Sequence, residues 1–177
     1  IFGENRVQEG LGKSRELPPE LEWHLIGPLQ SNKAKRAVEL FTTVHSVDRL
    51  KIARYLDREA GERGAVLDCF LEVNLAGEES KAGFPARDLA ARVAPVAELG
   101  SLRVVGLMAI PPNPFDPEES RPWFRRLREL SEALAGRPEW PDWPGKLSMG
   151  MSADFDVAVE EGASHVRVGT ALFGERG

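Results

Sequence analysis

Hydrophobic and polar positions along the chain form two alternating patterns. Short apolar or period-two runs predict strands, and longer runs with apolar residues three or four apart predict helices. With the apolar opening Ile1–Phe2 counted as the end of a strand, seven strands are expected. The other six expected strands cover 22–27, 42–47, 68–75, 104–110, 146–151 and 165–173. The expected helices cover 31–41 with Ser31 as its cap, a segment from Asp48, 84–99, one containing 123–134, and 153–161.

Strict alternation of strand and helix predicts a parallel sheet with helices outside it. We therefore expect an α/β fold, a TIM-like (β/α)₈ barrel, which needs eight strands. The missing strand would lie upstream of Ile1, and the chain opens without Met. We accordingly expect residues 1–177 to be a single, N-terminally truncated barrel domain.

Two expected strands near the end of the chain run directly into glycine and hydroxyl residues, in 147–152 and 165–174. Backbone N–H groups exposed at such turns are well suited to bind phosphate. In the second strand Arg167 points away from the face shared by Val166 and Val168. A guanidinium facing the barrel interior needs either a buried carboxylate or the polar part of a ligand. Gly169 and Thr170 beside it favour the ligand.

Composition narrows the class of protein. With 177 residues, 42% of them hydrophobic and 29% charged, the chain is long enough for one domain with a sizeable core. The net charge is −5, and the basic residues are scattered, which argues against a nucleic-acid partner; Arg121, Arg125, Arg126 and Arg128 are expected to form a solvated helix face. No apolar run is long enough to span a membrane. The single Cys69 is expected to be a small buried hydrophobe in a reducing, cytoplasmic compartment.

Several long segments together closely resemble the pyridoxal-phosphate homeostasis protein (YggS/PROSC) family. They are FGENRVQE at 2–9, WHLIGPLQSNK at 23–33, GLMAIP at 106–111, LSMGMS at 147–152 and RVGT at 167–170. The resemblance covers the whole chain and implies a barrel of the alanine racemase N-terminal domain type. It further implies a protein that binds pyridoxal 5′-phosphate (PLP) and buffers or delivers it, without established turnover. The implied partners are PLP and apo forms of PLP enzymes, with no nucleic acid and no membrane.

The resemblance also implies roles for individual residues. Arg167 would face the pyridine nitrogen of PLP, and Gly169 and Thr170 would bind its phosphate. Ser152, expected at the N-cap of its helix, would be a third phosphate contact, and Ser148 a further one. Three more residues have two interpretations each. Asn5 and Asn74 would either line the ring or cap turns, and His24 would either line the pocket or pack inside the barrel. His45 and His165 are expected to be structural, since nothing around them suggests a metal site.

One feature of the family has no counterpart here. Its Schiff-base lysine lies on the first strand, in a segment resembling Val-Ser-Lys, and residues 1–177 contain no such segment. Lys146 is at the wrong end of its strand, and Lys13 and Lys51 are expected on helices. Lys33, Lys35 and Lys81 follow strand ends but belong to other motifs. We therefore expect no lysine of this chain to form the Schiff base.

Two other functions remain possible from the sequence. A PLP-dependent racemase or decarboxylase on the same barrel would need an acid and a base, commonly Tyr or Cys from a second domain, and the only tyrosine, Tyr55, is expected within a helix. A sugar-phosphate isomerase barrel would need a carboxylate base at a strand end. Glu4 could serve there, whereas Glu72 is expected to point poorly. Neither alternative accounts for the full set of motifs.

Overall fold

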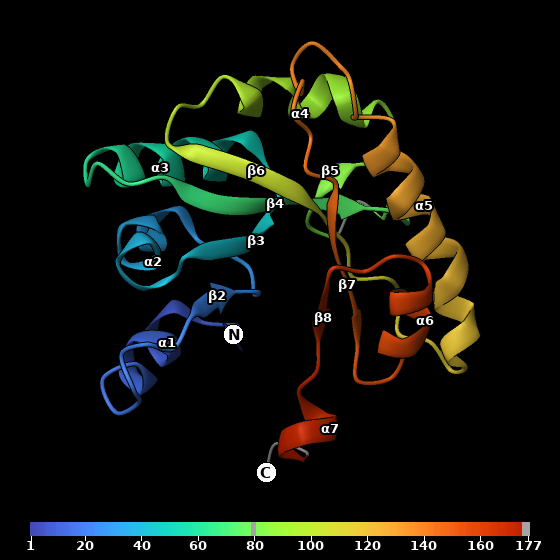
Figure 1. Cartoon of the computed structure of the whole chain (residues 1–177), viewed down its shortest axis with the longest axis horizontal. Helices are drawn as coiled ribbons and strands as arrows, with labels where there is room; N and C mark the ends of the chain where they lie inside the picture. Colours follow the sequence, from blue (N-terminus) through green and yellow to red (C-terminus); the bar gives the residue numbers. More distant parts are fainter. Residues whose placement is uncertain (79–80, 175–177) are drawn as a thin grey trace.

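The computed structural model describes residues 1–78 and 81–174. Seven parallel strands lie side by side and curve into a nearly closed barrel (Figure 1). Their order follows the chain, β1-β2-β3-β4-β6-β7-β8, and a short strand, β5, pairs with β4. The bounds are β1 Phe2–Glu4, β2 Trp23–Leu25, β3 Thr43–Val47, β4 Leu67–Asn74, β5 Phe84–Pro85, β6 Leu102–Met108, β7 Lys146–Met151 and β8 His165–Arg167. The expected TIM-like architecture is confirmed.

Helices cover the outer side of the sheet (Figure 1). The α-helices are α1 Val7–Lys13, α2 Ala34–Leu40, α3 Leu50–Gly61, α4 Leu89–Ala97, α5 Arg121–Glu132, α6 Phe155–Glu160 and α7 Thr170–Phe173, with 3₁₀ turns η1 Ser31–Lys33 and η2 Pro117–Ser120. Helix α5 illustrates why they pack there. Its Phe124, Leu127 and Leu130 recur at helical spacing and are buried, whereas the arginines between them reach solvent.

Several expected element boundaries are wrong, each for a local reason. The region 84–99 is not one helix, because Phe84–Pro85 pairs with β4 and α4 begins only at Leu89. The last strand stops at Arg167 and not at residue 173, since the chain turns at Gly169 into α7. Ser31 opens a 3₁₀ turn and makes no side-chain cap for α2.

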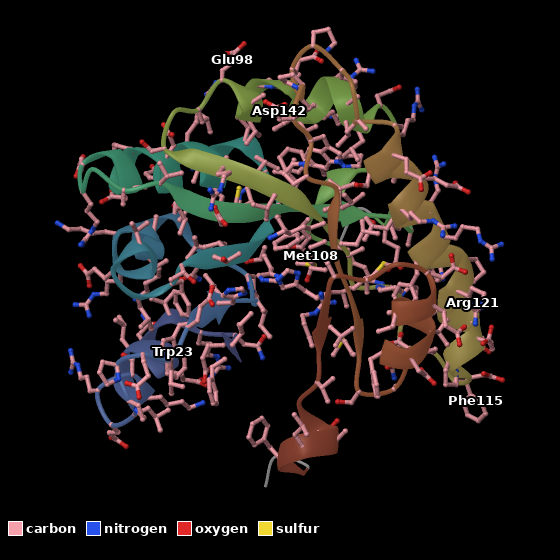
Figure 2. The ribbon with its side chains drawn as sticks, viewed as in Figure 1. Trp23, Glu98, Met108, Phe115, Arg121 and Asp142 are labelled. Atoms are coloured by element: carbon pink, nitrogen blue, oxygen red, sulfur yellow. The ribbon has the colours of Figure 1, made fainter. Side chains whose placement is uncertain are left out.

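Buried apolar side chains form two separate clusters. The larger one lies between the sheet and the helices and includes Leu25, Leu56 and Phe124. The smaller one, which we call the inner cluster, consists of Phe70, Val105 and Met108. Met108 lies where the strands converge in the middle of the molecule, whereas the fully exposed Phe115 is at its periphery (Figure 2). Cys69 belongs to the larger cluster, and burial raises the pKa of its thiol to about 12, which confirms its expected role as a buried hydrophobe.

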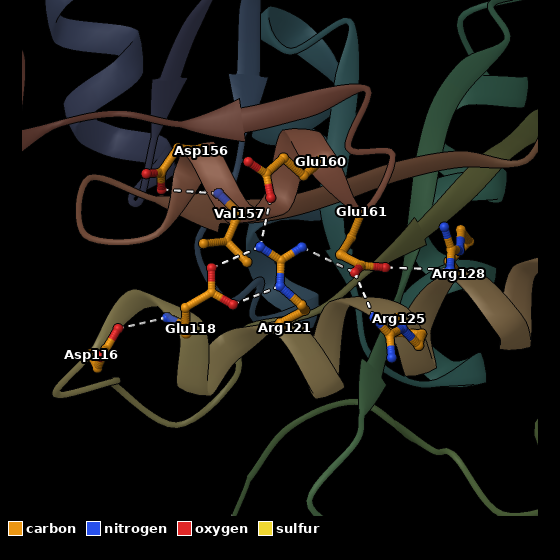
Figure 3. A network of polar contacts seen from close by, with 9 residues as sticks. All are labelled: Asp116, Glu118, Arg121, Arg125, Arg128, Asp156, Val157, Glu160 and Glu161. Carbon is orange, nitrogen blue, oxygen red and sulfur yellow. Dashed lines mark hydrogen bonds and ion pairs between the residues drawn. The ribbon is translucent and has the colours of Figure 1, made fainter.

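Arginines of α5 join this helix to α6 (Figure 3). Arg121 pairs with Glu118, Glu160 and Glu161, and Arg125 and Arg128 also reach the Glu161 carboxylate, which is only 6% exposed. A carboxylate so well shielded needs several cationic partners. The arginine side chains are 26% to 54% exposed, so the face is solvated as expected, but it also holds α6 through Glu161, whereas Arg126 pairs with Glu129 on the same helix.

The sheet path ends at β1 and β8, which are not paired with each other in the described part of the chain. Large apolar side chains are exposed on both of these edges. Ile1 and Phe2 lie on or beside β1, and Leu172 and Phe173 lie on α7 after β8. Across the described ranges, no helix is both long and apolar enough to cross a membrane.

Strands β6 and β7 approach closely at Gly106, which pairs with Lys146. A Cβ atom at Gly106 would overlap the backbone carbonyl group of Lys146, which cannot move without distorting β7. We predict that Gly106→Ala lowers the free energy of unfolding by roughly 3 kcal/mol or more. Chemical denaturation followed by circular dichroism measures this change.

Gly12→Ala provides the matched control. Gly12 lies in α1, and a Cβ there would have no neighbour within 4 Å. Because alanine is the better helix former, this variant should gain about 0.5–1 kcal/mol. Equal stability of the two variants would contradict the close approach of β6 and β7.

Candidate functional site

The loops after β7 and β8 meet at the carboxyl end of the sheet. The Ser152 hydroxyl oxygen accepts hydrogen bonds from the backbone N–H groups of Gly169 and Ala171, at 3.2 and 3.4 Å. Gly150, near the end of β7, suits its position because its φ is +89° and a Cβ atom there would lie only 2.5 Å from the Ala158 side chain of α6. Two donors thus converge on one oxygen beside Thr170, the first residue of α7.

Ser152 is not the N-cap of its helix, contrary to expectation. Helix α6 begins at Phe155 with Asp154 as its N-cap residue. The Asp154 carboxylate instead accepts the N–H of Met151 and the hydroxyl of Ser120. Ser152 is therefore left at the junction of the two loops, where it can face a ligand.

Arg167 ends β8 with its guanidinium inside the barrel. Its Nη1 donates to Ser148 Oγ at 2.8 Å and its Nη2 to the Ala109 carbonyl at 3.0 Å. Burial lowers the pKa of Arg167 to about 10, partly offset by Asp154 and Glu72, so the group keeps its charge at neutral pH. These partners are neutral, so the expected alternative of a direct ion pair with a buried carboxylate is not what the structure shows.

Ser148 and His24 lie deeper in the barrel than the loops. Ser148 is fully buried, and its hydroxyl contacts Arg167 and His45, whereas its contact with a phosphate stays a prediction. His24 hydrogen-bonds His45 and Glu22, as in the second of its two readings, packing inside the barrel.

The two asparagines also have defined positions. The Asn74 amide donates to the Glu78 carbonyl and accepts the N–H of Gly77, as the turn-capping reading requires. Asn5 is exposed just after β1, and its backbone lies against Gly27, so close that a side chain on Gly27 would overlap it. The loops after β1 and β2 therefore meet at the same end of the sheet as Ser152.

Glu72 is a titratable group that was expected to point poorly toward a ligand. It shares the strand face of Phe70, a member of the inner cluster, and lies near the carboxyl end of β4. Burial and the nearby Asp48 raise its pKa to about 7, whereas Arg167 acts in the opposite direction. Because side chains two residues apart on a strand share a face, the spacing between Phe70 and Glu72 could have identified this position of Glu72 from the sequence.

Imidazoles form another polar part of the interior, in keeping with the structural role expected of His45 and His165. His24, His45 and His165 come from three different strands, with ring centroids 5.1 to 6.0 Å apart, and His45 stacks on Phe70. Over residues 1–78 and 81–174, no three His, Cys, Asp or Glu side chains are arranged to hold a metal ion.

Glu72 should make stability depend on pH. Its pKa rises from 4.5 to about 7 on folding, so the folded state binds this proton more tightly than the unfolded chain does. The contribution of Glu72 to the free energy of unfolding is therefore greatest below about pH 4.5 and is lost as the pH rises toward 7. We predict that Glu72→Gln gains roughly 1–2 kcal/mol relative to wild type between pH 5 and pH 8, after allowance for partial exposure.

Urea denaturation at both pH values measures this difference. Glu98→Gln, at an exposed carboxylate at the end of α4, is the control, and the Glu72→Gln difference is measured against it at each pH value. A Glu72→Gln difference that does not grow with pH would contradict the buried position of this carboxylate.

Comparison with known proteins gives consistent matches along the chain. Residues 1–177 match the family described as alanine racemase, N-terminal domain. A pyridoxal phosphate homeostasis protein of Aquifex aeolicus is 46% identical over 99% of this chain and 77% of its own length. One of Pseudomonas aeruginosa is 47% identical over 99% of this chain and 74% of its own length.

Solved structures agree with these matches. PipY of Synechococcus elongatus, solved with PLP bound, is 44% identical with a TM-score of 0.87, covering 98% of this chain and 81% of that one. An alanine racemase of Clostridium difficile shares the fold at 16% identity, with a TM-score of 0.77 over 98% of this chain and 44% of that one. The continuous match over the barrel and the high identity of the relatives show that this chain belongs to the alanine racemase N-terminal domain family, among its pyridoxal phosphate homeostasis proteins.

Proposed function

We propose that this chain binds PLP at the carboxyl end of its barrel and serves to buffer or deliver the cofactor inside the cell. The observation that carries the proposal is the position of Arg167, a buried cation fixed beside a loop junction whose N–H groups converge on one oxygen. The names of the relatives and the PLP bound to PipY support the same ligand.

The residues present fit such a ligand. Backbone N–H groups of Gly169 and Ala171, with the hydroxyls of Ser152 and Thr170, offer the hydrogen-bond donors that a phosphate needs. Arg167 would place an N–H group against the ring nitrogen, and Asn5 would line the ring from the loop after β1. Asn74 and His24 would contribute through the shape of the loop and of the barrel interior.

The chemistry of these residues favours a carrier over an enzyme. PLP supplies an aldehyde and an electron-withdrawing ring, and a cationic Arg167 at the ring nitrogen keeps that nitrogen unprotonated and the ring a weak electron sink. The only tyrosine, Tyr55, lies on α3 outside the sheet, with the Arg58 guanidinium over its ring. Among the described strands only β7 contains a lysine, Lys146, at its amino end, so we propose that none of these strands supplies the Schiff-base lysine.

We expect the phosphate contacts to distinguish PLP from free pyridoxal. Thr170→Val combined with Ser152→Ala removes two hydroxyl groups that only the phosphorylated ligand can use. Each charge-assisted hydrogen bond contributes on the order of 1.5 kcal/mol or more, so PLP should bind ~100-fold more weakly and pyridoxal about as before. Isothermal titration of both ligands measures the two effects.

Ser14→Ala is the matched control, since its hydroxyl bonds the Leu11 carbonyl at the end of α1 and lies outside the two loops. It should leave both affinities unchanged. An equal loss of affinity for the two ligands in the double variant would place the phosphate elsewhere.

A second prediction separates a carrier from a racemase. The loaded protein should reactivate an apo PLP enzyme, whereas α-protons of L- and D-alanine in deuterated water should exchange no faster than with PLP alone. NMR follows the exchange, and the activity of the recipient enzyme follows the transfer. Stereochemically defined exchange at roughly 1 per second or faster would favour an enzyme instead.

A further inference from the structure

A line of hydrogen bonds runs through the barrel from one end to the other. It starts at Glu22, just before β2 at the amino end and 51% exposed, and it ends at Arg167, the last residue of β8. The successive contacts are Glu22 Oε1 to His24 Nε2 at 3.0 Å, His24 Nδ1 to His45 Nε2 at 2.9 Å, His45 Nδ1 to Ser148 Oγ at 2.7 Å, and Ser148 Oγ to Arg167 Nη1 at 2.8 Å. We call these five residues the axial chain.

The two ends of the axial chain fix its direction. Arg167 can only donate, so Ser148 Oγ accepts at that end. The Glu22 carboxylate can only accept, and its pKa is lowered chiefly by the hydrogen bond from His24, so His24 Nε2 donates at the other end.

When both histidines are neutral, only one arrangement of protons satisfies the hydrogen bonds in the middle of the axial chain. His24 Nδ1 accepts from His45 Nε2–H, and His45 Nδ1 accepts from the Ser148 hydroxyl. His45 is held neutral because burial, followed by the neighbouring His24, His165 and Arg167, lowers its pKa to about 2. Every donor therefore points from the cation at Arg167 toward the anion at Glu22.

We propose that the axial chain positions the Arg167 guanidinium and couples it to the protonation state of His24 at the opposite end of the barrel. This inference rests on the proposed function only where it concerns PLP. His45 is the central positioning residue, because it alone connects His24 with Ser148 and contacts neither Arg167 nor the two loops by a hydrogen bond.

Protonation of His24 would reverse the middle of the axial chain. With a proton on both ring nitrogens, His24 Nδ1 must donate to His45 Nε2, and neutral His45 must then carry its proton on Nδ1 and donate to Ser148. Ser148 Oγ then accepts from His45 and Arg167 together, and its own hydrogen turns away from His45. The groups that face His24 are Glu22, His45 of β3 and His165 of β8, with Lys146 of β7 near His165.

The coupling can be tested without any ligand. In the protein labelled with ¹⁵N, imidazole nitrogen shifts should show the Nε2–H tautomer for both His24 and His45 when His24 is neutral. On acidification the Arg167 side-chain ¹⁵N signal should shift with the same midpoint as the His24 imidazole. An Nδ1–H tautomer at His45 while His24 is neutral, or an Arg167 signal that does not change as His24 titrates, would overturn the proposal.

Two variants of neighbouring imidazoles sharpen the test. His45→Phe breaks the axial chain, whereas His165→Phe removes an imidazole from the same interior that hydrogen-bonds Ser164 and takes no part in the chain. The Arg167 signal should lose its dependence on His24 in His45→Phe and keep it in His165→Phe. If His45→Phe does not fold, His45→Leu, whose side chain has no hydrogen-bonding group, takes its place.

PLP binding provides the second readout. The His45→Phe protein should bind PLP roughly 3- to 10-fold more weakly than the His165→Phe protein, the factor expected from one neutral hydrogen bond. Equal affinities would overturn the positioning role. If the wild-type protein does not bind PLP, the proposed function fails, while the ligand-free NMR titration still decides whether the axial chain couples His24 to Arg167.

Discussion

A guanidinium inside a protein requires acceptors that hold it while it keeps its charge, and the placement of Arg167 determines much of the interior of this barrel. The Ala109 carbonyl and the Ser148 hydroxyl satisfy two of its nitrogens. Ser148 in turn requires His45, and His45 requires His24. Four strands thus contribute polar side chains to an interior in which Phe70, Val105 and Met108 form only a small apolar cluster.

The outer side of the sheet follows a different rule. There the apolar faces of the helices pack on the strands, and one group of ion pairs fixes one helix against another. The Glu161 carboxylate, which receives Arg121, Arg125 and Arg128, links α5 to α6 in this way. This link stands directly behind the loop of Ser152, because α6 follows that loop in the chain. The helix that these ion pairs hold is thus the one that begins where the Ser152 loop ends.

Local patterns in the sequence were sufficient to locate the seven strands of the barrel, though not all of their ends, and to place Arg167. The alternation of Val166 and Arg167 places the guanidinium inside, since side chains of a strand alternate between its faces. Patterns of this kind could not place Ser152, whose role arises from contact with Gly169 seventeen positions away, nor predict β5, which has only two residues. The contact between His45 and Ser148 joins residues 103 positions apart, and the spacing of residues within one strand or helix cannot predict such a contact. The helix start at Phe155 was missed because Ser152 and Asp154 are equally good capping residues, and the sequence alone does not say which of them precedes the helix.

The separation of the two apolar clusters has a consequence for how such a barrel can change over evolutionary time. The cluster between sheet and helices contains most of the buried apolar side chains, and it includes none of the polar residues that surround Arg167. Substitutions in the interior can therefore alter chemistry while the scaffold keeps its main source of hydrophobic stabilisation. A barrel built in this way can be adapted to a new reaction by exchanging a few inward-facing side chains, without redesign of the layer that makes it fold.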